Sequence, residues 1–425
     1  MAIASLSGVR HRSPVRRAAD FIDSMGVATH IPYTDGGYSN ISNIVTNLAY
    51  LGISNVRDGI SNGYGGSAYV NSYETIASAG VKFMIFPVSG TVSSSDVTSQ
   101  LAIVKTLVTA NPGSVFCIEG PNEINNGPFS YNGVADLAGA ITLQGDLYNA
   151  IHGISADAAF AGIKVAYFTG YAAGSIGTGP NPYTQAGLAD FDTQHPYPNG
   201  GTGPYTNMVK ATALPNESAP YGPAVYTETG YSTNGGAGTN NVDAAVQSKF
   251  ILALYLDAFQ QGITKTYVYQ LMDAYNTGSP QGNDGFGLFQ PPSIGNTVPK
   301  AAATAIHNFT TIMADAGGTA RSFLTSTVPY TLTGMPVSGN SLVLQKSSGL
   351  IDIIVWAEPV IWNQSTGSEV AAGTNSVTVN FGATHSTIAV FDPLVGTSAI
   401  ASSTNASSVV ISLIDHPLIV EISLS

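Results

Sequence analysis

KFMIFPVSGTVSSSDVTSQLAIVKTLVTANPGSVFCIE, residues 82–119, contains one complete strand–helix–strand unit. The apolar runs at 82–88 and 114–119 are typical of buried strands. Residues 93–109 carry spaced apolar side chains behind Ser residues that can cap a helix. A helix that connects two such strands is the unit from which parallel sheets are built, so this stretch predicts an α/β fold.

The same alternation extends in both directions along the chain. Strands are predicted at 21–30, 55–58, 82–88, 114–119, 164–168, 191–195, 224–228 and 266–270, and helices at 42–51, 93–109, 134–151, 243–261 and 300–316. Eight strand-then-helix units match a (β/α)8 TIM barrel in number and length. A doubly wound open sheet is the alternative, but it requires a glycine-rich phosphate turn after the first strand. Residues 29–40, THIPYTDGGYSN, contain no GxGxxG.

The pattern changes near residue 317. Runs with a period of two residues, separated by Gly, Ser and Asn, predict a C-terminal β-sandwich domain over 317–425. The catalytic barrel is expected over 20–316. Residues 1–19 form an N-terminal segment that holds four of the six Arg residues, and it is a candidate strand of the sandwich.

Charge is unusually sparse in this chain. Charged residues make up 9% of it, against about 25% in typical domains. The net charge of −12 repels phosphate backbones and argues against nucleic-acid binding. No apolar run reaches the length of a membrane span, and the single Cys117 excludes an internal disulfide. We expect a secreted or extracytoplasmic protein, although no signal peptide is visible; oligomeric state stays open.

Two carboxylates follow barrel strands at the end where such barrels keep their functional groups. The fourth strand leads into Glu119-Gly120-Pro121-Asn122-Glu123, and the seventh ends at Glu228. The chain contains eight Glu in all, which makes this placement informative. Two carboxylates across a barrel mouth suit glycoside hydrolysis, in which one protonates the leaving oxygen and the other attacks the sugar or activates water.

With these motifs the chain resembles the retaining glycoside hydrolases of clan A. The resemblance implies that Glu123, preceded by Asn122, is the acid/base and that Glu228 is the nucleophile. It covers nearly the whole chain and is most like family 39, with families 30, 51 and 79 as close competitors. The preference for family 39 rests on the layout of a barrel followed by a sandwich. The segments DGFGLF (284–289) and PKA (299–301) lead from one to the other.

The resemblance also places supporting residues around the two carboxylates. It puts Arg57, His30 and the His195-Pro196-Tyr197 turn at strand ends where the group keeps support residues. Arg57 is the natural partner of Glu228, with Tyr197 or Tyr269 as a further donor. Asn122 is expected to bind the 2-hydroxyl of the sugar.

The remaining candidates concern the binding of sugar. His30 and His195 are expected to hydrogen-bond sugar hydroxyls. The clan A enzymes that the chain resembles often carry a Trp platform at the end of strand eight, but this barrel has no Trp. Stacking is therefore expected from Tyr or Phe, and Gln270 is expected to replace the platform with a hydrogen-bonding group. Glu119 is expected to face the barrel wall, where a buried carboxylate needs a partner.

The main hypothesis is a retaining glycosidase that acts on a neutral or nearly neutral poly- or oligosaccharide. Scarce Lys and Arg argue against uronic acids, and the His spacing predicts neither metal nor cofactor. A catalytically silent carbohydrate-binding protein on the same scaffold is the alternative, and an inverting hydrolase is a third possibility. Long loops around 171–187, 198–222 and 274–298 are expected to shape the cleft.

Overall fold

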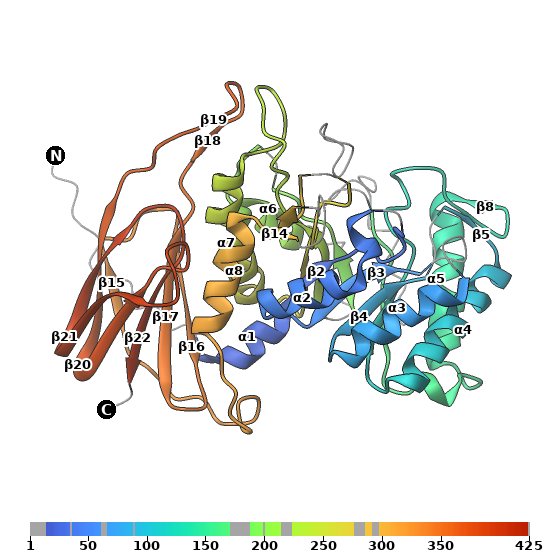
Figure 1. Cartoon of the computed structure of the whole chain (residues 1–425), viewed down its shortest axis with the longest axis horizontal. Helices are drawn as coiled ribbons and strands as arrows, with labels where there is room; N and C mark the ends of the chain where they lie inside the picture. Colours follow the sequence, from blue (N-terminus) through green and yellow to red (C-terminus); the bar gives the residue numbers. More distant parts are fainter. Residues whose placement is uncertain are drawn as a thin grey trace.

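The computed structural model describes residues 14–34, 36–60, 66–87, 90–170, 188–198, 200–213, 223–275, 285–290 and 297–423. The predicted loop 171–187 and parts of the other two predicted loops lie outside these residues. Figure 1 shows two parts side by side: a barrel of strands and helices, and a layered β domain built from the C-terminal quarter of the chain.

Eight parallel strands form the barrel. They are β2 (Met25–Ala28), β3 (Asn55–Gly59), β4 (Lys82–Phe86), β6 (Val115–Glu119), β9 (Lys164–Ala166), β10 (Asp192–Gln194), β11 (Ala224–Thr229) and β12 (Thr266–Val268). They pair in the order β10-β11-β12-β2-β3-β4-β6-β9. A parallel bridge between Ala166 and Phe191 joins the two ends. The predicted (β/α)8 barrel is therefore confirmed.

Helices cover the outside of the barrel. They are α1 (Ala18–Ser24), α2 (Ile41–Leu51), α3 (Gly66–Ser78), α4 (Ser94–Ala110), α5 (Asp136–His152), α6 (Pro204–Ala213), α7 (Ala244–Gln260) and α8 (Ala301–Ile312). Asn40, Ser93 and Asp243 cap α2, α4 and α7 with side-chain oxygens. Among the described residues, no helix has both the length and the apolar character that crossing a bilayer requires.

The structure differs from the predicted pattern in several places, and helix α3 was not predicted at all. Residues 21–24 belong to helix α1 rather than to the first strand, because Phe21 packs against Phe259 and Phe309 beneath the barrel. Helix α6 lies inside the predicted loop 198–222, where Pro204 begins the helix. The last barrel helix ends at Ile312 rather than near residue 316.

The C-terminal domain is the predicted β-sandwich. Its main strands are β15 (Thr331–Thr333), β16 (Gly339–Gln345), β17 (Leu350–Ala357), β20 (Asn375–Phe391), β21 (Ala399–Leu413) and β22 (Leu418–Ser423). The two halves of β20 pair with different strands, the first with β15 and the second with β22. Strand β1 (Arg16–Arg17) pairs in parallel with β16, so the described end of the N-terminal segment joins this domain.

Side chains on one face of β16 and β17 attach the sandwich to the barrel. Leu342, Leu344, Ile354 and Trp356 belong to the core shared with the barrel helices. Their neighbours Val343, Ile353 and Val355 belong to the core inside the sandwich. Because successive side chains of a strand face opposite ways, one sheet contributes to both cores. The two domains therefore share one continuous apolar interface, with β16 beside α1 (Figure 1).

Two acidic side chains lie at this interface. Asp257 of α7 is fully buried, and its Oδ1 accepts a hydrogen bond from Trp356 Nε1 at 3.1 Å. Burial is the main cause that raises the pKa of Asp257 far above 3.8, and the nearby carboxylate of Glu358 raises it further. Burial likewise raises the pKa of Glu358. A proton on Asp257 therefore favours the docked domains.

We expect Asp257→Asn to make folding stability less dependent on pH. A raised folded-state pKa means that the stabilisation is complete below the ordinary pKa of 3.8 and is lost as pH rises through the raised value, at about 1.4 kcal/mol per pH unit. The amide of Asn does not ionise, so the variant does not lose this folding stability as the pH rises. Free energies of unfolding measured by helical circular dichroism between about pH 4 and pH 8 test this. Equal pH slopes for both proteins would contradict it.

Candidate active site

Arg57 joins three sequence-distant segments at the C-terminal end of the barrel. Arg57 lies on β3 and is only 2% exposed. Its Nε donates to Glu119 Oε2 at 2.6 Å, its Nη1 to Glu228 Oε1 at 2.6 Å, and its Nη2 to Asn122 Oδ1 at 2.6 Å. The guanidinium also lies over the ring of Phe86, with Cζ 4.5 Å from the ring centroid. One planar cation therefore fixes β3, β6 and β11 relative to each other.

Glu228, on β11, is surrounded by groups that stabilise its ionised carboxylate. Tyr197 donates its hydroxyl to Glu228 Oε2 at 2.8 Å, opposite the bond from Arg57. Burial is the largest influence and would raise the pKa of Glu228, but His195, Arg57 and Tyr197 outweigh it and lower that pKa below its ordinary value. The side chain is 12% exposed, so it is charged and still reachable from the mouth of the barrel.

Glu123 faces Glu228 from the turn after β6. Its backbone φ of 44° is left-handed, which is uncommon for a residue with a side chain. Thr169 Oγ1 accepts from the Glu123 backbone N–H at 2.9 Å and so holds this turn. The Glu123 carboxyl lies 2.7 Å from His195 Nδ1 and accepts from Asn126 Nδ2 at 2.8 Å. The turn thus aims the carboxyl at the mouth of the barrel.

His195 connects the two carboxyl groups. Its Nδ1 lies 3.7 Å from Glu228 Oε2 as well as 2.7 Å from Glu123, and its Nε2 lies 3.0 Å from Thr227 Oγ1. One oxygen of Glu123 and one of Glu228 lie within 4.8 Å of each other. The two carboxyl groups are therefore close enough to act on one bond.

The ends of strands one and eight form an aromatic wall beside this centre. His30 Nε2 lies 2.8 Å from the Tyr269 hydroxyl, and the His30 ring stacks on Tyr33 at 4.6 Å. Burial lowers the pKa of His30 to about 4, against a raising influence of Glu228, so this imidazole is neutral at pH 7. Tyr275 stacks beyond Tyr33, and Phe286 packs edge-on against Tyr269. Tyr and Phe thus line this side, in a barrel that has no Trp.

The structure brings most of the predicted site residues into one network. Direct contacts connect Arg57, Asn122, Glu123, His195, Tyr197 and Glu228, while His30 and Tyr269 form the adjoining pair. Gln270, the remaining predicted site residue, is 1% exposed, and its amide oxygen accepts a hydrogen bond from the Tyr38 hydroxyl at 3.0 Å.

Sequence reasoning gave less weight to other members of the site. Glu119 is fully buried and forms a two-point ion pair with Arg57. The sequence did offer one sign that Glu119 belongs to the site. It precedes Glu123 by four residues, and this spacing places both near the end of the same strand. Asn126 and Thr227, which contact Glu123 and His195, lie in the stretches that follow or end strands four and seven, but neither was a predicted site residue.

Glu123, His195 and Glu228 also have the geometry of a possible metal-ligand set, with one ligand atom each within 4.8 Å of the others. Two carboxylates and an imidazole suit a divalent transition metal. The same contacts serve proton transfer, since His195 already lies at hydrogen-bond distance from Glu123. The sequence-based expectation of a site without metal stays a prediction.

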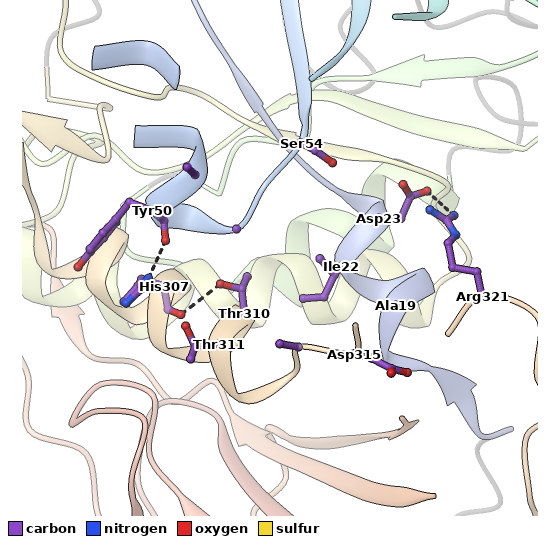
Figure 2. Close-up of a pocket in the computed structure, with 13 residues that line it drawn as sticks. Ala19, Ile22, Asp23, Tyr50, Ser54, His307, Thr310, Thr311, Asp315 and Arg321 are labelled. Carbon is purple, nitrogen blue, oxygen red and sulfur yellow. Dashed lines mark hydrogen bonds and ion pairs between the residues drawn. The ribbon is translucent and has the colours of Figure 1, made fainter. Parts of the chain in front are cut away.

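A cavity of about 460 Å³ lies at the opposite end of the barrel, between α1, α2 and α8 (Figure 2). Two pairs of its lining residues bind each other: Arg321 pairs with Asp23, and His307 Nδ1 contacts the Tyr50 carbonyl. Lys265, outside the lining, also pairs with Asp23. These contacts join α1 to residues 265 and 321, and α2 to α8. We therefore assign this cavity a structural role.

Comparison with known proteins supports the fold. No family model matches the chain, and no curated protein matches it in sequence. A solved monomeric beta-xylosidase from Caulobacter crescentus CB15 is similar with a TM-score of 0.60 and 13% identity, over 98% of each chain. A GH39 enzyme from Xanthomonas axonopodis pv. citri is similar with a TM-score of 0.57 and 14% identity, over 96% of this chain and 95% of that one.

A family 30 subfamily 8 xylanase from Clostridium acetobutylicum is also similar, with a TM-score of 0.53 and 11% identity over 99% of this chain and 98% of that one. At these identities the likeness is one of fold. The chain has the barrel-and-sandwich fold of family 39 and family 30 glycoside hydrolases, so the expected resemblance to family 39, with family 30 as a competitor, is confirmed at that level.

Proposed function

We propose that this protein is a retaining glycoside hydrolase that cleaves its substrate by double displacement. The observation that carries the proposal is the pair Glu123 and Glu228, whose oxygens approach within 4.8 Å at the C-terminal end of the barrel. Retaining enzymes keep their carboxyl groups about 5–5.5 Å apart, whereas inverting enzymes need about 6.5–9.5 Å to admit water. The short separation supports retention.

The two carboxyl groups take unlike roles because their surroundings differ. Glu228, bound by Arg57 and Tyr197, attacks the anomeric carbon as an ionised nucleophile and forms a covalent glycosyl-enzyme. Glu123 gives its proton to the leaving oxygen and then takes a proton from the water that cleaves the intermediate. His195, 2.7 Å from Glu123, orients that carboxyl. Asn122, which accepts a hydrogen bond from Arg57, is the residue that we expect to bind the 2-hydroxyl.

A neutral or nearly neutral poly- or oligosaccharide is the substrate class that this site favours. Arg57 is the cation of the described site, and two carboxylates already use it. A uronic acid would need a further cationic partner. Beside His30 and Tyr269, the partly exposed rings of Tyr33, Tyr275 and Phe286 are the candidates for sugar stacking. The low content of charged residues supports an extracytoplasmic location, where such polymers occur.

We expect Tyr197→Phe to shift the acid limb of the kcat/KM pH profile upward. Loss of the hydroxyl removes a hydrogen bond that lowers the pKa of Glu228, so this pKa rises, and kcat/KM falls about tenfold. Tyr205→Phe is a matched control, because Tyr205 is 46% exposed on α6. An unchanged acid limb in Tyr197→Phe would contradict the assigned contact.

The test of the proposed function is hydrolysis of a panel of aryl glycosides and neutral polysaccharides, with NMR identification of the anomer released first. Release of the retained anomer is the expected result. Release of the inverted anomer would contradict double displacement. Saturable glycan binding without any turnover would instead favour a catalytically silent binding protein.

A further inference from the structure

The sandwich reaches the mouth of the barrel through one hairpin. Strands β18 (Trp362–Asn363) and β19 (Ser368–Glu369) form this hairpin, which Figure 1 shows extending beside the loops above α6. Together with Glu358 it contacts barrel residues 200–205 and 236–240. We call this set of contacts the domain seam.

The domain seam is made of specific contacts on both barrel loops. Gln364 Nε2 donates to Asn240 Oδ1 at 2.8 Å, and the Gln364 carbonyl accepts from the backbone N–H of Gly238 at 2.7 Å. Asn240 in turn accepts, through its carbonyl, from the backbone N–H of Gly200 at 3.0 Å. Glu358 Oε2 accepts from the backbone N–H of Tyr205 at 2.9 Å, in the first turn of α6.

These contacts hold the segment that carries Tyr197. The Asn207 amide, one turn into α6, donates to the Tyr197 carbonyl. The Tyr231 hydroxyl donates to the Thr202 carbonyl at 2.7 Å from the strand-seven loop. The Tyr197 hydroxyl then donates to Glu228 Oε2 at 2.8 Å. A continuous set of contacts thus runs from the sandwich to the nucleophile.

Gly201 is the tightest point of the domain seam. Its φ is 71°, and a Cβ added there would lie 2.3 Å from the Cβ of Trp362. Trp362 is 4% exposed, so it cannot turn away from the loop. The backbone at Gly201 therefore lies directly against the sandwich, and any side chain at this position must displace the loop.

We propose that the sandwich is a working part of the catalytic centre: through Glu358, Trp362 and Gln364 it positions the Tyr197 loop and so keeps the Tyr197 hydroxyl on Glu228. These three are positioning residues, since none touches the reacting atoms. The inference rests on the proposed function and adds that the barrel depends on the domain seam to keep the Tyr197 hydroxyl at hydrogen-bond distance from its nucleophile.

The test compares Gly201→Ala with Gly113→Ala in the full-length protein. Both glycines have left-handed backbone, with φ of 71° and 79°, but Gly113 lies before β6, outside the domain seam, and a Cβ there meets nothing within 4 Å. Carbon-13 NMR of labelled Glu carboxyl groups, with the Glu228 signal assigned from Glu228→Gln, gives the pKa of Glu228 without any substrate. Gly201→Ala should raise this pKa and lower kcat/KM about tenfold, whereas Gly113→Ala leaves both unchanged.

A milder variant keeps the test valid if Gly201→Ala fails to fold. Gln364→Ala removes one hydrogen bond of the domain seam and should raise the pKa of Glu228 in the same direction by a smaller amount. An unaltered pKa of Glu228 in folded Gly201→Ala, or in Gln364→Ala, overturns the inference even if the wild type hydrolyses glycosides. Absence of turnover in the wild type, with the pKa shift present, overturns the proposed function alone.

Discussion

Glu228→Ala should lose turnover by a factor on the order of 10⁴ or more while keeping the fold of the wild type. The carboxylate supplies the bond to the anomeric carbon, and Tyr197 and Arg57 serve mainly to keep it ionised. Removing it leaves space beside Arg57 for a small anion. We therefore expect azide to restore part of the turnover of an activated aryl glycoside and to give a glycosyl azide of inverted configuration.

Glu74→Ala is the control for this experiment, because Glu74 lies on the outer helix α3. It should keep wild-type kinetics and remain insensitive to azide. Turnover of Glu228→Ala near the wild-type rate would contradict the nucleophile assignment, as would an azide product of retained configuration.

Arg57→Met should cost about 3–5 kcal/mol of folding stability in addition to activity. Arg57 is 2% exposed and binds Glu119, which is fully buried, as well as Glu228. Burial alone would lower the pKa of Arg57, but the two carboxylates raise it well above its ordinary value. Without the guanidinium, two negative groups remain in a site that excludes most water.

The measurement is denaturant unfolding followed by helical circular dichroism. The barrel contains the helices, whereas both Trp residues belong to the sandwich, so Trp fluorescence would report the wrong domain. Arg321→Met is the control: Arg321 is 55% exposed in its pair with Asp23 and should cost less than about 1 kcal/mol. A loss of that small size for Arg57→Met would show that the buried network does not hold the strands together.

Much of the fold could be predicted because regular periodicity repeats along the chain. Eight apolar runs separated by capped helical segments determine a barrel whatever their precise ends. The errors arose where local pattern and packing disagree. Residues 21–24 are apolar enough for a strand but form helix α1, because Phe21 fills a space between α7 and α8. Helix α6 carries few apolar residues, so its period was not visible among Gly, Pro and Tyr.

The candidate site could be predicted as far as strand ends could be recognised. Glu123, Glu228 and Arg57 follow or end strands, and a barrel brings strand ends together. Partners fixed by tertiary turns could not be read in this way. The pairing of Glu119 with Arg57 and the domain seam at Gly201 depend on where distant segments of the chain cross. Such crossings leave no periodic signal in the sequence.

The central claim is that Glu228 forms a covalent bond with the sugar. The most direct measurement uses a slowly hydrolysed 2-deoxy-2-fluoro aryl glycoside of a sugar that the enzyme accepts, followed by intact-mass and peptide analysis of the protein. The account predicts one added glycosyl group, carried by Glu228 in the peptide that contains Thr227 and Thr229. A wild type that hydrolyses the parent glycoside yet carries the label on another residue would contradict it.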